Sequence, residues 1–470
     1  MSVGPHTAGS SESSEASRGC HRRGDRLSPG ALDFSASGHL YATHGLNAFA
    51  ARCPPPLARW AIETFTDAGD VVLDSMCGSG TTVVEATLTG RQGLGVDIDP
   101  LARLLTLAKA TPLPATQVSS LADVIRNKAP GVPDDGWRPD MPRLDYWFRP
   151  EVSADLARLR RLIIEVTEPG PLRRLGWAVF SSLIVGRTSV ANAWDLVHSR
   201  HHYRPWEEDP GTISRFVRGV DRAARLMDDY EKLLPADWKP ASVVGDDARS
   251  MTLPDGAVDL VFFSPPYVSA LDYPRAHAFA VAWLADVVGM TPDEYRRHAR
   301  RYVGTDRAPL AGVTTNHPLP APTGNEVVDV AVDALRDAPE RAWVVSRYFA
   351  DMASVFAEAA RVTRPGGHVV VVVCPSNIRK VHVPTHEIFQ TLAPAATDGR
   401  LRLEEHYVRT IHDRRRVMPY LEAKFGERMR EEYVLVFCRR SGRRPLSRSS
   451  AVGRASDPRR RAAVGPSTQS

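Results

Sequence analysis

The pattern of apolar and polar positions divides the chain into strand-like and helix-like parts. Short apolar runs that end at turn or acidic residues predict strands at residues 70–74, 93–99, 241–247, 258–263, 368–374, 401–410 and 432–438. Apolar positions that recur every three or four residues predict helices at 57–65, 150–165, 171–185, 212–233 and 346–362. Strands alternating with helices predict an open, Rossmann-like α/β sheet, and the last two strands predict an antiparallel pair that closes it.

Changes in composition along the chain predict five parts. Residues 1–36, rich in Ser and Gly, predict a disordered leader, and residues 439–470 a basic disordered tail. The sheet domain is expected in two pieces, 37–115 and 241–438. Residues 116–240 show only helical periodicity and are too long for a connection inside a compact sheet, so they predict an inserted helical subdomain.

Composition narrows the class of protein. The chain has 470 residues, 43% of them hydrophobic and 24% charged, which is enough to bury a sizeable core. We expect a cytoplasmic protein without a membrane partner, because no apolar run has membrane-spanning length and the N-terminus lacks an apolar signal core. The five cysteines include no CxxC pair, which predicts neither a zinc site nor a disulfide framework, and no other metal is expected.

The strand at residues 258–263 runs directly into Ser264-Pro265-Pro266-Tyr267. Neither proline can donate to a ladder, so the strand ends there, and the fixed φ of both residues stiffens the turn. The Ser264 hydroxyl and the Pro265 carbonyl are thereby held as acceptors at the carboxyl end of a strand, where open α/β sheets bind ligands. Two acceptors on the hydrogens of a ring-conjugated amine can favour a nucleophilic nitrogen without a strong base, and Tyr267 offers a face for stacking. These four residues are therefore candidate catalytic residues, and an ordinary Pro-Pro turn is the alternative.

A second motif follows the strand at residues 70–74. The chain turns at Cys77-Gly78-Ser79-Gly80 and a helix begins, so backbone can approach a ligand closely at the helix N-terminus. The turn lacks the Gly-Lys-Ser/Thr ending of a phosphate loop. Asp97, at the end of the next strand, can accept both ribose hydroxyls of a nucleoside cofactor. A dinucleotide-binding unit shares the turn and the acid, although the residues after Gly80 do not fit GxGxxG.

Together these motifs resemble those of the amino-group DNA methyltransferases. Asp-x-x-Cys-Gly-Ser-Gly-Thr-Thr-x-x-Glu-Ala and then Gly-x-Asp-x-Asp-Pro resemble their S-adenosylmethionine motif, and Ser-Pro-Pro-Tyr resembles their catalytic motif. The Pro-headed helix at 57–65 resembles their cofactor-flanking motif, and the resemblance covers roughly residues 39–115 and 241–438. Ser75-Met76 departs from the Pro-Phe often found after the Asp. The resemblance implies these cofactor-binding residues: Asp74, Cys77, Gly78, Ser79, Gly80, Thr81, Thr82, Asp97, Ile98 and Asp246.

The resemblance also implies a function. It is that of a site-specific DNA methyltransferase, which uses S-adenosyl-L-methionine on a base flipped out of double-stranded DNA. Ser in the first position of the tetrapeptide goes most often with cytosine N4 in that family, so N4-methylcytosine is the predicted product. Three alternatives stay open: an adenine N6 enzyme, an RNA or protein amino-methyltransferase, and a nucleic-acid-binding protein with a decayed methyltransferase fold. Restriction or defence proteins are the partners that such an activity implies.

Several segments are candidate contacts with DNA. Basic and aromatic residues interleave at 194–204, and three arginines follow one another at 414–416; both patterns suit phosphate contacts, with polar loops as the alternative. Arg275 and His277, close to the catalytic loop in sequence, could touch the flipped base or its phosphates, with surface contacts within the domain as the alternative. Residues 290–340 are polar and Pro-rich and are expected to form a mobile loop over the site.

Overall fold

A computed structural model describes residues 32–34, 40–49, 52–184, 189–192, 211–268, 272–305, 318–411 and 431–441. The basic segments at 194–204 and 414–416 lie outside these ranges, as does nearly all of the expected leader and tail. Leu32, within the expected leader, is buried, and the Asp33 carboxylate accepts a hydrogen bond of 2.7 Å from the backbone N–H of Thr410. Packing against the sheet therefore begins earlier in the chain than the composition indicates.

A seven-stranded sheet organises the described residues, in the order β3-β2-β1-β4-β5-β9-β8. The first five strands are parallel, and β9 runs antiparallel to both of its neighbours. Their bounds are β1 Val71–Asp74, β2 Gln92–Val96, β3 Ser242–Gly245, β4 Val258–Phe263, β5 Thr363–Val373, β8 Leu401–Thr410 and β9 Glu431–Arg439. The Rossmann-like α/β sheet and its antiparallel closing pair are confirmed; a separate hairpin joins β6 (Ser376–Ile378) to β7 (Val381–Val383).

Strand β4 is buried on both faces, as its apolar run predicts. Val261 and Phe263 pack in one core cluster with α13 (Pro339–Val362), and α14 (Thr385–Ala396) joins the same cluster. Leu260 and Phe262 pack in another cluster with α1 (Pro55–Phe65). Because helices cover both faces, the open positions of this sheet are at the ends of its strands.

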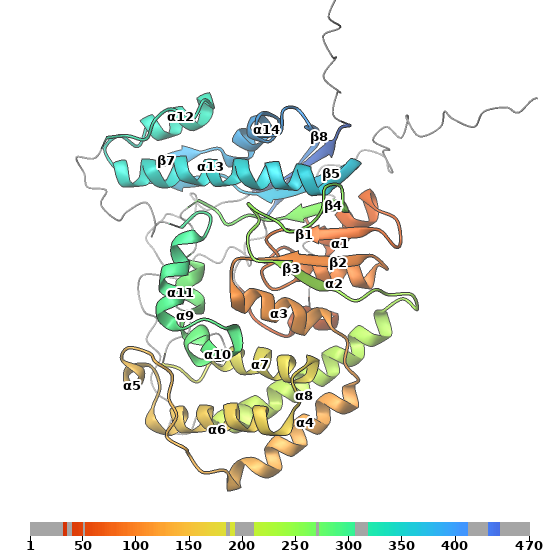
Figure 1. Cartoon of the computed structure of the whole chain (residues 1–470), viewed down its shortest axis with the longest axis vertical. Coiled ribbons are helices and arrows are strands. Elements are labelled where there is room, and N and C mark those ends of the chain that lie inside the picture. The colour runs from red at the N-terminus through yellow and green to blue at the C-terminus, as the bar shows by residue number, and fades with distance from the viewer. Residues whose placement is uncertain are drawn as a thin grey trace, which may run out of the picture.

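The described residues between β2 and β3 are mostly helical. After α2 (Thr81–Leu88) and α3 (Pro100–Ala110), the helices that follow lie in Figure 1 on the side of the sheet opposite to α13. They are α4 (Ala115–Lys128), η2 (Ala129–Gly131), α5 (Leu144–Trp147), α6 (Pro150–Val166), α7 (Pro171–Ile184) and α8 (Thr212–Leu233). They share a core cluster with α2 and α3, and α6, α7 and α8 occupy the ranges that the periodicity predicts.

The expectation of a mobile loop over residues 290–340 is wrong for the described part of that range. It holds α11 (Pro292–His298), η3 (Ala299–Arg301) and α12 (Glu326–Asp333), preceded by α9 (Tyr273–Trp283) and α10 (Ala285–Val288). The helix signals are in the sequence: Thr291 and Glu294 form a capping box, and the Asn325 side chain caps α12. No helix within the described ranges is both long and apolar enough to cross a bilayer.

Candidate active site

The site lies where the strand order reverses. Going outward from β1, the chain continues to β2 and β3 on one side, and β4 and β5 lie on the other side. In the register, Asp74 at the end of β1 lies opposite both Gly95 and Phe262. The turn after β1 and the tetrapeptide after β4 therefore leave the sheet side by side, at the position where open α/β sheets bind ligands.

The turn between β1 and α2 depends on two glycines with left-handed backbone. Gly78 has φ of 51° and Gly80 has φ of 82°, and the N–H of Gly80 donates to the Cys77 carbonyl at 2.7 Å. A Cβ added at Gly80 would lie 2.9 Å from the Cα of Thr106 in α3. The sequence predicts that Gly80 leaves room for a ligand; the structure shows instead that it leaves room for α3. Gly78 faces Phe49, whose ring would lie 3.1 Å from an added Cβ.

Two carboxyl groups flank this turn, the buried Asp74 and the half-buried Asp97. Burial raises the pKa of Asp74 to about 7, and burial together with the nearby Asp99 raises the pKa of Asp97 to about 6. The Asp97 carboxylate accepts hydrogen bonds from the N–H of Gly78 at 2.7 Å and from the N–H of Asp99 at 2.8 Å. Acids with raised pKa values are typical of functional sites, and a bound cation would favour their ionised forms.

Buried hydroxyl groups in the same turn also lack partners. The Oγ atoms of Ser75 and Ser79 make no hydrogen bond within the described residues, although both side chains are buried. Buried polar atoms are nearly always hydrogen-bonded, so these two fit a turn that receives a polar ligand. The neighbouring candidates lie in the same place: Thr81 and Thr82 begin α2, and Cys77 contacts Thr106 with its thiol at 3.4 Å.

The helices after the tetrapeptide at residues 264–267 are fixed to the loop that follows Asp97. His277 in α9 meets the Asp99 carboxylate at 2.5 Å, and the Tyr295 hydroxyl of α11 donates to the same carboxylate at 3.3 Å. Asp99 also caps α3 through the N–H of Leu101 at 2.8 Å. Burial acts to lower the pKa of His277, but the Asp99 carboxylate outweighs it, and the pKa lies above its ordinary value. For His277 the structure therefore favours the contact within the domain over a contact with DNA, because the side chain is buried and bonded to Asp99.

Sequence reasoning missed Asp99 and Tyr295 as members of this cluster. A signal for Asp99 exists, since Asp before Pro at a helix start is a common N-cap, and the structure shows that cap. No local pattern indicates Tyr295, because its partner lies far away in sequence. The His298 ring nitrogen Nε2 adds a contact of 2.9 Å with the Ile98 carbonyl.

The tetrapeptide presents different environments along its length. Pro265 is buried, while Ser264 and Tyr267 are half-buried. The Tyr267 hydroxyl donates to Glu432 of β9 at 2.9 Å and accepts from the Cys374 thiol at 3.3 Å. Burial raises the pKa of Tyr267 well above its ordinary value, so this phenol stays protonated and is no general base at neutral pH. The Ser264 hydroxyl makes no hydrogen bond to another described residue.

Asp246 has the weakest support among the predicted residues. It follows β3 and is exposed, and no described residue is bonded to its side chain. The next residue, Asp247, is ion-paired with Arg249 at 2.8 Å and with Arg301 at 3.2 Å. The strand end is where the sequence predicts it, but the adjacent acid is already engaged.

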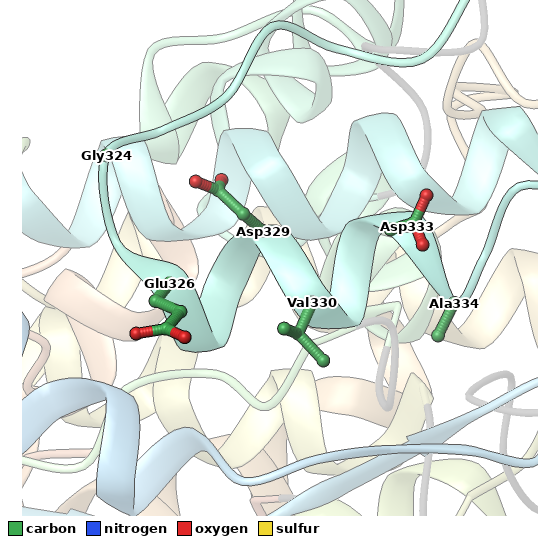
Figure 2. A pocket seen from close by; sticks show the side chains of 6 residues that line it. All are labelled: Gly324, Glu326, Asp329, Val330, Asp333 and Ala334. Carbon is green, nitrogen blue, oxygen red and sulfur yellow. The ribbon is translucent and has the colours of Figure 1, made fainter.

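Two other features resemble sites but lack the necessary chemistry. Atoms of His368, Glu404 and Cys438 lie within 4.8 Å of one another, yet Cys438 is disulfide-bonded, which the cysteine spacing does not predict and which occupies its sulfur. Figure 2 shows a hollow beside α12 where Glu326, Asp329 and Asp333 point in different directions. Asp329 accepts hydrogen bonds from Thr323, so the hollow is a capped helix start with surface acids.

Comparison with known proteins finds similarity to DNA methylases. Residues 20–105 match the DNA methylase family. The chain is 25% identical over 375 residues to the type II methyltransferase M.MvaI of Kocuria varians, covering 74% of this chain and 80% of the relative. It is 30% identical over 66 residues to the type II methyltransferase M.MjaII of Methanocaldococcus jannaschii, covering 14% of this chain and 12% of the relative.

A solved S-adenosylmethionine-dependent methyltransferase from Methanosarcina mazei matches with a TM-score of 0.29 and 10% identity, over 80% of this chain and 95% of that one. The assignment of the fold rests on the strand order and not on this low similarity. The family match and the curated relatives confirm the resemblance predicted from the motifs.

Changing Gly80 to Ala tests the packing of the glycine turn. Both Gly80 and Gly136 have positive φ, but an added Cβ meets α3 only at Gly80 and has nothing within 4 Å at Gly136. We expect Gly136→Ala to cost about 1 kcal/mol of unfolding free energy from backbone strain, and Gly80→Ala about 1–3 kcal/mol more from overpacking. Chemical denaturation followed by circular dichroism measures the difference. Equal costs in the two variants would contradict the assigned contact with Thr106.

Proposed function

We propose that this protein, which resembles the amino-group DNA methyltransferases, transfers a methyl group from S-adenosyl-L-methionine to N4 of a cytosine in double-stranded DNA. The observation that carries the proposal is the pairing of β1 with β4, which brings the glycine turn and Ser264-Pro265-Pro266-Tyr267 to one edge of the sheet. Ser264 in the first position supports cytosine over adenine as the target. An adenine N6 enzyme is the alternative, and the identity of the product distinguishes the two.

The residues around the glycine turn fit S-adenosyl-L-methionine. When bound, this cofactor supplies an electrophilic methyl group on a sulfonium ion and also carries an ammonium group. Asp97 keeps a second lone pair on each oxygen for the ribose hydroxyls, since each oxygen already accepts one backbone N–H. The unpaired Ser75 and Ser79 hydroxyls and the raised pKa of Asp74 support a polar, cationic ligand at this turn.

The tetrapeptide supplies the chemistry on the base. The Ser264 hydroxyl and the Pro265 carbonyl would accept hydrogen bonds from the exocyclic amine, so that its lone pair points towards the methyl group. The methylated nitrogen is then a strong acid and loses its proton without a dedicated base. Tyr267 stays neutral and is tied to Glu432, so its ring can stack on the flipped base, a contact worth about 1–3 kcal/mol.

Exposed arginines beside the site suit contacts with DNA phosphates. Arg297 of α11 and Arg300 of η3 are exposed, and neither forms an ion pair with a described residue. The Tyr295 hydroxyl bonds α11 to the Asp99 carboxylate. The chain just after η3 passes the loop that holds Tyr267, since a Cβ on Gly304 would lie 3.4 Å from the Tyr267 carbonyl. A flipped base in the loop would leave flanking phosphates near these cations.

We also propose the division of the chain that composition predicts. The methyltransferase domain would comprise residues 37–115 and 241–438, with residues 116–240 as a helical insertion that helps to position DNA. The curated relatives are named type II methyltransferases, which supports a restriction-modification role with a partner nuclease.

Cofactor affinity should depend on pH. The folded pKa values of Asp74 and Asp97, about 7 and about 6, lie above the ordinary value, and a cationic ligand favours the ionised forms. We expect the Kd for the cofactor to fall as pH rises from 5 to 7, by at most about tenfold per pH unit for each proton released. Asp97→Asn should weaken binding and flatten this slope. Calorimetric titration across that range measures both, and a pH-independent Kd in the parent would oppose the assigned site.

Variants of the tetrapeptide test the chemistry. Ser264→Ala should lower the methylation rate about 10- to 100-fold by removing one acceptor, while leaving cofactor affinity unchanged. Tyr267→Ala should also lose rate through the missing ring. Tyr267→Phe keeps the ring but removes the donor to Glu432, so its loss should be smaller. Incorporation of labelled methyl groups into DNA gives the rates, and full activity in both Ala variants would remove this site from the mechanism.

The salt dependence of DNA binding tests the arginine surface. If Arg297 and Arg300 each neutralise a phosphate, replacing both by Ala should reduce the slope of log K against log salt concentration by about two. The modified sequence should stay the same, because phosphate contacts position the protein and do not read bases. Arg336→Ala with Arg402→Ala removes the same charge from exposed positions outside α11, η3 and residues 116–240. If that pair changes the slope as much, the footprint lies elsewhere.

A further inference from the structure

Arg409 is a buried arginine with unpaired donors. It lies in β8 and is 3% exposed, opposite Glu432 in the register of β8 with β9. Its Nη1 atom is 3.3 Å from a Glu432 oxygen, but neither Nη1 nor Nε makes a hydrogen bond within the described residues. A guanidinium cannot neutralise itself by losing a proton, so burying such donors without acceptors is unfavourable. An acceptor supplied by a ligand would remove that cost.

Glu432 connects this arginine to the catalytic loop. One carboxylate oxygen accepts from the Tyr267 hydroxyl at 2.9 Å, and the other is the neighbour of Arg409. The Cys53 thiol, just before the Pro-headed helix, lies in the same electrostatic environment: burial raises its pKa most, Glu432 raises it further and Arg409 lowers it. Arg409 therefore belongs to the wall of the site that also holds Tyr267, although it is distant in sequence from both motifs.

We propose that Arg409 reads the target base, donating to the ring-edge acceptors O2 or N3 of the cytosine that stacks on Tyr267. The inference rests on the proposed function and adds a specificity-determining residue to it. Burial favours the base over a phosphate, because the DNA backbone stays at the protein surface while a flipped base enters the protein. Donor chemistry favours cytosine over adenine, because adenine has no carbonyl oxygen and cytosine offers one beside its ring nitrogen.

A cycle of protein variants and base analogues tests the proposal. The proteins are the parent, Arg409→Met, which removes the donors, and Arg409→Lys, which keeps a cation beside Glu432. The control is Arg402→Met, an exposed arginine on the same strand. Each is assayed for kcat/KM on duplexes whose target is cytosine, 3-deazacytosine without the N3 acceptor, or 2-thiocytosine with a weaker acceptor in place of O2.

Arg409→Met should lower kcat/KM on cytosine about 10- to 100-fold without changing cofactor affinity. Arg402→Met should keep the kcat/KM of the parent. For the parent, kcat/KM on at least one analogue should be about tenfold or more below kcat/KM on cytosine. This difference should vanish in Arg409→Met and partly return in Arg409→Lys. Equal analogue penalties in the parent and Arg409→Met would overturn the proposal, since an arginine acting only through Glu432 slows every substrate alike. A parent that methylates no cytosine would refute the proposed function and this inference with it; a parent active on cytosine with unchanged penalties refutes the inference alone.

Discussion

Strand β1 pairs in parallel with β2 on one side and with β4 on the other, and every feature of the site depends on this pairing. Parallel strands end at the same edge of a sheet, so the turn after Asp74 and the loop after Phe263 emerge together without any side chain having to bridge them. The pairing also requires strands buried on both faces, which explains the unbroken apolar run of β4. The backbone hydrogen bonds between strands thus place the two loops beside each other, and side chains then hold the surrounding helices and strands in position.

Two clusters of side chains, one on each side of that edge, hold these elements in position. On one side Asp99 gathers His277 and Tyr295, which holds α9 and α11 against the end of β2. On the other side Glu432 of β9 contacts Tyr267 in the loop after β4 and Arg409 in β8. Each cluster joins segments that are far apart in sequence. Each places a carboxylate at its centre, where low dielectric strengthens the interactions with its donors.

The sheet, the two motifs and the long helices could be predicted from the sequence because each rests on local patterns. Apolar runs, glycines in a turn and paired prolines act within a few residues of one another. The short helices α11 and α12 were missed because polar composition hid their caps at Thr291 and Asn325. No local pattern indicates which contact His277 makes or that Arg409 lies at the site, because tertiary packing alone brings their partners to them.

The central claim is that this edge of the sheet transfers a methyl group to an exocyclic amine of a DNA base, with cytosine N4 as the atom. Mass spectrometry of nucleosides measures this directly, on DNA incubated with the purified protein and S-adenosyl-L-methionine that carries a trideuterated methyl group. The account predicts labelled N4-methylcytosine. Label found only on adenine would contradict the choice of base, and DNA that acquires no label while RNA or protein does would contradict the claim itself.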